Sequence, residues 1–197
     1  LKAGGFRQAK SDENVFYKLD GEGKLRALIV VHVDDLLILA TSTSQIYKDL
    51  VSHMERTYDL KELASDIYVG TQISRDEARK MIKVHQEHTV RHILEEFNMT
   101  NCNPLKVPAE PGKMLEPALP GEEVNDPKLP FRKLVGMLIW LLRTRPDIRF
   151  AVSQLCRVMG KYTARHWAAG KKILRYLQGT RDRGLIYYAG ENPELEV

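Results

Sequence analysis

The chain has 197 residues, of which 43% are hydrophobic and 28% charged, and its formal net charge is +4. This composition is ordinary for a folded globular protein and excludes disordered and collagen-like chains. No apolar run approaches the roughly 20 residues of a membrane-spanning helix, and the first residues lack the apolar segment of a signal peptide. We therefore expect an intracellular protein, cytoplasmic or nuclear. Its two cysteines, Cys102 and Cys156, are too few for a disulfide framework.

The first hundred residues combine strand and helix patterns. Ser44 predicts the N-cap of an amphipathic helix that runs to about Tyr58, because apolar residues repeat after it at helical spacing. Residues 87–97 predict a second helix of the same kind. We expect an α+β unit in which both helices cover an antiparallel sheet. Runs of β-branched and aromatic residues predict its strands over 15–20, 25–33, 36–40, 66–74 and 81–84.

The most apolar stretch, residues 28–40, contains two adjacent aspartates. Its sequence is LIVVHVDDLLILA, with Asp34 and Asp35 near its centre. Burial of two neighbouring carboxylates is costly, because each loses hydration and the charges repel at short range. A β-hairpin with the pair at its tight turn removes that cost by placing both carboxylates outside the sheet. A divalent metal ion is the usual reason to hold carboxylates together in this way.

Residues 104–130 hold seven of the nine prolines. Proline fixes φ and removes a backbone donor, so we expect no regular structure in this segment. It is predicted to connect an α+β unit over 1–103 with a basic helical region over 131–197. The pattern of that region predicts three helices and a final strand without an obvious partner, over 131–142, 148–159, 164–178 and 184–189.

Five stretches, in order along nearly the whole chain, resemble the reverse transcriptase of copia-type LTR retrotransposons. The acidic stretch VHVDDLLIL, residues 31–39, is similar to the Tyr-Val-Asp-Asp hairpin of that family. An Asp-Asp pair alone is a weak signal, but the ordered set is highly specific because it includes TRPDI, HW and ILRYLQGT. The other stretches are GFRQAKSDENVFYK from residue 5, RHILEEFNMTNCNPLKV from residue 91, FRKLVGMLIWLLRTRPDIRFAVSQL from residue 131 and HWAAGKKILRYLQGTRDRGLIYY from residue 166.

The resemblance implies an incomplete polymerase palm that carries the Asp-Asp hairpin, followed by a helical thumb and connection. In the family, the fingers and a first palm strand with a third metal-binding aspartate lie upstream of the matching stretch, and a ribonuclease H domain follows it. Asp12, Glu13 and Asp20 belong to a segment that matches a downstream position, so none of them replaces that aspartate. We therefore expect a piece of a longer polyprotein.

The resemblance also implies roles for residues of the acidic stretch. Asp34 and Asp35 map onto catalytic aspartates that bind Mg²⁺, or Mn²⁺, for two-metal nucleotidyl transfer. Without the third carboxylate, we expect weak metal binding and no activity from this chain in isolation. His32 takes the position of an aromatic residue that contacts the primer end. The equally weighted alternative for His32 is a strand histidine with a structural role only.

Basic residues are concentrated in the C-terminal part, where residues 143–183 include eleven Lys/Arg and two Asp. Because a polymerase thumb holds its template-primer through the phosphates, these side chains are predicted to form a salt-sensitive nucleic-acid grip. The alternative is an ordinary helical bundle with a charged exterior and a core that includes Trp140 and Leu141. The residues assigned to nucleic-acid binding are Arg143, Arg145, Lys161, Arg165, Lys171, Lys172 and Arg175.

Two alternatives stay open at this point. His85, His88 and His92 stand at helical spacing and suggest zinc, but no Cys or carboxylate completes the set, and a solvated helix face is the better interpretation.

The leading functional hypothesis is a reverse transcriptase fragment whose intact protein uses an RNA or DNA template-primer and dNTPs. The other hypothesis is a non-catalytic retrotransposon remnant that binds nucleic acid or serves as a structural component of a larger assembly.

Overall fold

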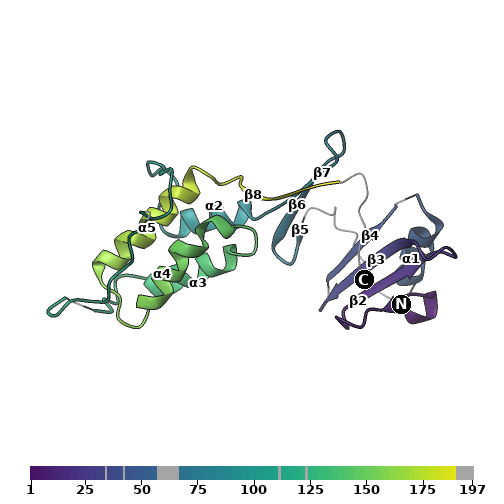
Figure 1. The fold of residues 1–197 in the computed structure, drawn as a ribbon, viewed down its shortest axis with the longest axis horizontal. Helices are drawn as coiled ribbons and strands as arrows, with labels where there is room; N and C mark the ends of the chain where they lie inside the picture. Colours follow the sequence, from purple (N-terminus) through teal and green to yellow (C-terminus); the bar gives the residue numbers. More distant parts are fainter. Residues whose placement is uncertain (34, 42, 57–66, 111, 123, 190–197) are drawn as a thin grey trace. The chain divides into compact units, whose positions relative to one another are not determined.

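The computed structural model describes residues 1–33, 35–41, 43–56, 67–110, 112–122 and 124–189 (Figure 1). Its contacts divide the chain into two compact units, residues 1–69 and 70–197. Both units contain helices and antiparallel β-sheet, which agrees with the predicted mixed α and β class. Within the described ranges, no helix is both long enough and apolar enough to cross a membrane.

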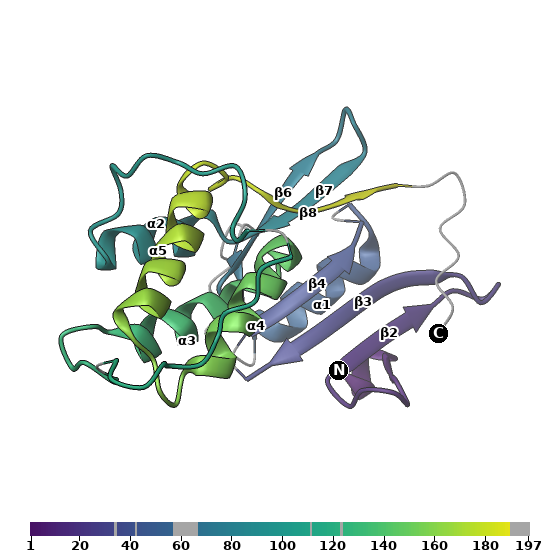
Figure 2. The same cartoon turned by 60° about the vertical axis from the view of Figure 1, so that its left-hand side comes forward.

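The first unit is built on an antiparallel sheet whose four strands pair in sequence order (Figure 2). A short turn joins β2 to β3 in an antiparallel hairpin. In its turn Gly23 has a φ of 81°, and the Asp20 carboxylate accepts hydrogen bonds from the backbone N–H groups of Glu22 and Lys24. The elements are η1 (Lys2–Gly4), β1 (Arg7–Gln8), β2 (Val15–Leu19), β3 (Leu25–His32) and β4 (Asp35–Ala40).

Helix α1 (Gln45–Glu55) packs against this sheet. The predicted N-cap is confirmed, because the Ser44 hydroxyl accepts a hydrogen bond from the Tyr47 N–H at 3.3 Å. The predicted end of the helix near Tyr58 lies outside the described residues. The buried core of the unit joins one face of α1 to β3 and the N-terminal segment through Phe6, Ala27, Ile29, Leu50 and Met54.

The second unit contains an antiparallel sheet of β6 (Thr71–Asp76), β7 (Met81–His85) and β8 (Gly184–Tyr188). The final strand, which had no expected partner, pairs with β7 from before the helical region, and Figure 1 shows the two side by side. The predicted strand over 66–74 is divided in two. A short β5 (Ile67–Tyr68) ends before Val69 and Gly70, whose positive φ values of 47° and 68° interrupt the extended backbone.

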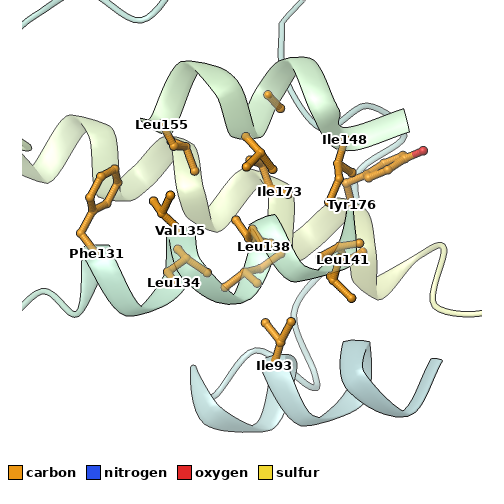
Figure 3. Close-up of a cluster of buried hydrophobic side chains, with 14 of the residues drawn as sticks. Ile93, Phe131, Leu134, Val135, Leu138, Leu141, Ile148, Leu155, Ile173 and Tyr176 are labelled. Carbon is orange, nitrogen blue, oxygen red and sulfur yellow. The ribbon is translucent and has the colours of Figure 1, made fainter. Parts of the chain in front are cut away.

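Four α-helices among the described residues of the second unit enclose its core (Figure 3). In the figure, Ile93 of one helix points toward Leu141 of the next, and both are fully buried. Truncation of such a side chain to alanine generally costs about 2–5 kcal/mol, so this cluster provides much of the stability of the unit. The helices are α2 (Glu87–Glu96), α3 (Phe131–Leu141), α4 (Arg149–Val158) and α5 (Ala164–Gln178), with the 3-10 turn η2 (Pro146–Ile148) before α4.

The boundary between the units lies at residues 69 and 70, whereas the sequence placed it in the proline-rich segment. The observed boundary differs from the predicted one because of α2, which was expected to cover the first sheet. Val90, Ile93 and Leu94 on its apolar face are instead buried in the core shared with α3, α4 and α5. An amphipathic pattern shows that a helix has an inner face, but it does not show which core that face joins.

The proline-rich segment over 104–130 forms no helix or strand in its described residues, as predicted. It runs along the helical bundle and is attached to α5 and the loop before it. The Leu105 N–H donates to the carbonyl oxygen of Arg175 at 3.2 Å, and the Asn125 N–H donates to the carbonyl oxygen of Tyr162 at 2.8 Å. The segment is therefore part of the second unit and not a linker between two bodies.

Candidate functional site

The acidic stretch forms the predicted hairpin. β3 ends at His32, β4 begins at Asp35, and these two residues lie opposite one another in the antiparallel register. His32 and Asp35 are both exposed, and Val33 is 86% exposed. The hairpin therefore presents its acidic end to solvent at Asp35, as expected, whereas Asp34 lies outside the described residues.

A buried layer fixes the position of this hairpin. Ile29 of β3 is fully buried and pairs with Ile38 of β4. Leu50 and Met54 of α1 belong to the same core cluster. Because the strands are held by this packing, the exposed end is supported by a rigid base, as a metal or substrate site requires.

Tyr68 is a titratable neighbour of the acidic end. Burial raises the pKa of its phenol, and the Asp35 carboxylate raises that pKa further, because a phenolate beside a carboxylate is disfavoured. Tyr68 therefore remains protonated at neutral pH and keeps an O–H donor in the neighbourhood of Asp35. No pattern in the sequence singled out this residue, since its proximity to Asp35 depends on how the chain returns after α1.

The described residues contain no group of three or more His, Cys, Asp or Glu side chains that could hold a metal ion. Asp34 lies outside these residues. Asp34 and Asp35 would supply two carboxylates, and oxygen donors of that kind suit Mg²⁺ or Mn²⁺.

The three histidines do not share one helix face. α2 begins at Glu87, so His85 lies at the end of β7, where it is buried and its Nε2 is 3.0 Å from the Ser74 hydroxyl. Burial lowers the pKa of His85, and the nearby Lys83 charge lowers it further. His88 and His92 are exposed on α2, which agrees with a solvated helix face.

Arg145 was assigned to nucleic-acid binding, and the structure corrects this assignment. Its side chain is only 1% exposed and lies 2.8 Å from an Asp147 carboxylate oxygen. It also donates a hydrogen bond to the carbonyl oxygen of Thr180 at 2.9 Å. A buried guanidinium with these partners cannot reach a phosphate, and Arg145 therefore has a structural role.

Three other assigned cations hold the proline-rich segment against α5. Each is partly exposed but already has a partner on that segment or on the residue just before it, which reduces its availability to a phosphate. These contacts could not be predicted from the sequence, because they join residues far apart along the chain. They connect Arg165 with Glu122, Lys172 with Glu110, and the Arg175 Nε–H with the carbonyl oxygen of Asn103.

The remaining assigned cations, Arg143, Lys161 and Lys171, are exposed. The guanidinium of Arg143 lies 4.0 Å from the ring centroid of Trp140 and donates a hydrogen bond to the Thr71 hydroxyl at 3.0 Å. Trp140 is 46% exposed, so the expectation that it belongs to the core was wrong. The ring instead provides a surface on which the guanidinium stacks, while the neighbouring Leu141 is fully buried as expected.

Residues 1–111 match a family model described as reverse transcriptase (RNA-dependent DNA polymerase). The chain belongs to the reverse transcriptase family. The match includes the whole acidic hairpin and α1, and it confirms the family that the ordered motifs of the sequence predicted. No solved structure matches the chain.

Relatives of this reverse transcriptase chain include proteins of very different length. It is 31% identical over its full length to the retrovirus-related Pol polyprotein from transposon TNT 1-94 of Nicotiana tabacum, but spans only 15% of that protein. It is 31% identical over 86% of its length to an uncharacterized mitochondrial protein of Arabidopsis thaliana, of which it covers 68%. It is also 29% identical over its full length to a putative transposon Ty5-1 protein of Saccharomyces cerevisiae, of which it covers 63%.

Proposed function

We propose that this chain carries the acidic hairpin of an RNA-directed DNA polymerase of copia-type retrotransposon origin. The observation that supports the proposal is the β3–β4 hairpin, which exposes Asp35 at its acidic end within the family match. Asp34 precedes Asp35 directly in sequence, and the proposal therefore assigns both carboxylates to the metal site.

In this proposal Asp34 and Asp35 bind Mg²⁺, and a third aspartate comes from the upstream part of the palm. The bound ions supply the two-metal chemistry, in which the 3′ hydroxyl is activated and the leaving pyrophosphate is stabilised. His32 is opposite Asp35 in the register and exposed, so its imidazole is available to contact the primer end. Protonated Tyr68 provides a hydrogen-bond donor in the neighbourhood of Asp35.

The partners of the intact protein are a nucleic-acid template-primer and dNTPs. The exposed cations of the second unit support a contact with phosphates, whereas buried Arg145 does not. In this proposal, polymerisation on a template-primer needs segments outside the 197 residues of this chain.

Metal binding by the full chain tests the proposed site directly. Water-proton relaxation with Mn²⁺ reports binding without any need for polymerisation. We expect weak binding that Asp34→Asn and Asp35→Asn each abolish, and that Glu22→Gln, in the β2–β3 turn at the opposite end of β3, leaves unchanged. Equal binding by all four proteins would exclude the acidic hairpin as the metal site.

A second candidate function is a non-catalytic, reverse transcriptase-derived component of a larger assembly. The observation that favours it is the presence of two relatives, the Arabidopsis mitochondrial protein and the yeast transposon protein, of which this chain covers about two thirds. Such relatives consist mainly of the region found here. In that case the charged and apolar surfaces of the second unit matter, while the acidic pair does not.

Primer extension separates the two functions. We would compare the chain with its Asp34→Asn variant in Mg²⁺ and in Mn²⁺. Extension that the substitution abolishes supports the polymerase and contradicts the non-catalytic role. If neither protein extends a primer, salt-dependent binding of a duplex decides whether a nucleic-acid-binding component remains.

A further inference from the structure

The sheet of the second unit has two edges of different kinds. Its strand order is β5-β6-β7-β8, so β5 forms one edge and β8 the other. β5 contains only two residues, and a very short edge strand is one of the ways in which proteins prevent the addition of a further strand. β8 is five residues long and pairs with β7 without a break in register, and no described residue pairs with its other side. The β8 edge is therefore open to another strand.

The backbone groups of alternate β8 residues point away from β7. The Ala189 N–H donates to the carbonyl oxygen of Lys80 at 2.9 Å, one position beyond the last pair of the β7–β8 register. Hydrogen-bonded and non-hydrogen-bonded pairs alternate along an antiparallel ladder, so the other odd-numbered residues of β8 also bond to β7. The N–H and C=O groups of Gly184, Ile186 and Tyr188 consequently face the open edge.

The side chains of β8 suit the addition of a strand. Ile186, Tyr187 and Tyr188 are 48%, 56% and 69% exposed, and β-branched and aromatic residues form the most favourable cross-strand pairs. Residues 184–189 read GLIYYA and contain neither a charged residue nor a proline, the residues that commonly protect an open edge. This edge thus lacks the usual devices that keep an edge strand unpaired.

The strand is complementary to a second copy of itself. Antiparallel pairing about a two-fold axis at Ile186 places this residue opposite its own copy, Leu185 opposite Tyr187, and Gly184 opposite Tyr188. In this register every outward N–H and C=O group of β8 meets an outward group of the other copy, and the whole strand is paired. The ring of Tyr188 then covers Gly184 of the other copy, as aromatic residues do in cross-strand pairs with glycine.

The charges on either side of β8 favour the same arrangement. Residues 181–183, before the strand, are two arginines and one aspartate, whereas residues 190–197, after it, include three glutamates and no cation. Antiparallel pairing brings the start of one strand to the end of the other, so the basic side of each copy adjoins the acidic side of its partner. A parallel pair would instead bring like charges together.

We propose that two copies of this chain associate through β8 and extend the sheet of the second unit across a two-fold axis. A pair of short strands buries little surface, so the dimer is reversible and depends on the concentration of the chain. The interface is separate from the acidic hairpin of the proposed function, so either proposal can fail alone.

Charge substitutions at Ile186 in the full chain test the interface. Ile186→Lys and Ile186→Glu each place two like charges opposite one another in the dimer, and each should weaken association at least about tenfold. An equimolar mixture of the two variants should restore association, because opposite charges then meet across the axis. Recovery in the mixture also shows that both variants are folded. The matched control is Ile139→Lys on α3, at a residue 45% exposed, which should associate as the unchanged chain does.

Two measurements report the association. Sedimentation velocity from micromolar to millimolar concentration gives the proportion of dimer. Amide hydrogen exchange, followed residue by residue by NMR, identifies the strand that pairs. The amides of Ile186 and Tyr188 should exchange more slowly as the concentration rises, whereas those of Leu185 and Tyr187, which already bond to β7, should change little.

Four outcomes would overturn the proposal. The first is a chain that stays monomeric over the whole range of concentration. The second is a dimer that both Ile186 variants form as readily as the unchanged chain, which would place the contact elsewhere. The third is a mixture of the variants that does not associate, which would exclude the two-fold register. The fourth is slow exchange of the Ile186 and Tyr188 amides in the monomer, which would show that another part of the same chain covers the edge.

Discussion

Arg145, directly before η2, and Asp147, within η2, form a bidentate ion pair. The Arg145 Nε–H and Nη2–H groups donate to the two carboxylate oxygens of Asp147 at 3.0 and 2.8 Å. The same guanidinium donates to the hydroxyl of Thr180 at 2.8 Å, and the Tyr176 hydroxyl donates to Asp147 at 2.7 Å. The pair therefore joins η2 to the C-terminal end of α5, within the motif that reads TRPDI in the sequence.

Asp147→Asn should destabilise the second unit by about 2–4 kcal/mol, because it leaves the charge of Arg145 buried without a counter-ion. Urea unfolding followed by tryptophan fluorescence measures the change. Asp182→Asn, in the exposed turn after α5, is the control and should shift the free energy of unfolding by less than about 0.5 kcal/mol. A loss as small as that of the control would show that the pair contributes no net stability.

The same pair makes stability depend on pH. Burial alone would raise the pKa of Asp147, but hydrogen bonds from Arg145 and Tyr176 outweigh it and hold that pKa below its ordinary value. A lowered pKa in the folded state contributes stability that is present above the unfolded pKa of about 4 and lost as the pH falls through the folded pKa. The free energy of unfolding should therefore decrease below about pH 4.

Asp147→Asn provides the control for this pH dependence. The difference in stability between the unchanged chain and the variant should be largest at neutral pH and should shrink as the pH falls below about 4. Urea unfolding at a series of pH values measures it. A difference that stays constant down to pH 2 would contradict the assignment to Asp147.

Local features of this fold could be predicted from the sequence, because they depend on neighbours in the chain. The Ser44 cap, the glycine turn before β3 and the hairpin between His32 and Asp35 all follow from short patterns, and the structure confirms them. The partner of β8 and the core that α2 joins could not be predicted, because both depend on contacts between distant segments. Periodicity specifies an inner face but not its partner.

The candidate site shows the same division. The adjacent aspartates were recognisable because two charges in an apolar stretch need an explanation. The sequence did not distinguish buried basic residues from exposed ones, since nothing in the basic residue type itself shows that Arg145 is buried and Lys161 exposed. One signal was available for Arg145, namely a carboxylate two positions later across a proline. Such a short spacing favours a local ion pair over a free cation.

Gly184→Ala should weaken the pairing of β8 with β7. A Cβ at Gly184 would lie 2.7 Å from the Cβ of His85 and also collide with the carbonyl oxygen of Val84, so the two backbones could not approach as closely as they do. We expect a cost of about 1–3 kcal/mol, as for other overpacked sites. Amide hydrogen exchange of residues 185–188 measures it and should show faster exchange.

Gly160→Ala is the control for that prediction, because a Cβ at this exposed glycine meets nothing within 4 Å. Exchange in β8 should be unchanged in this variant. Unchanged exchange in Gly184→Ala as well would mean that β7 and β8 accommodate the added methyl group and stay paired. The close approach at Gly184 would then not determine the position of β8.

Val33 is held in a left-handed backbone conformation beside the acidic pair, with a φ of 52°. A β-branched residue is disfavoured there, whereas Asn adopts the conformation readily, as Asn98 and Asn125 do in this chain with φ values of 53° and 57°. Val33→Asn should therefore stabilise the hairpin by about 1 kcal/mol. Slower amide exchange in β3 and β4 would report the gain, and Val107→Asn, at an exposed valine without a positive φ, should show none. Faster exchange in Val33→Asn would mean that the valine side chain itself supports the turn, and that the acidic end of the hairpin is not strained.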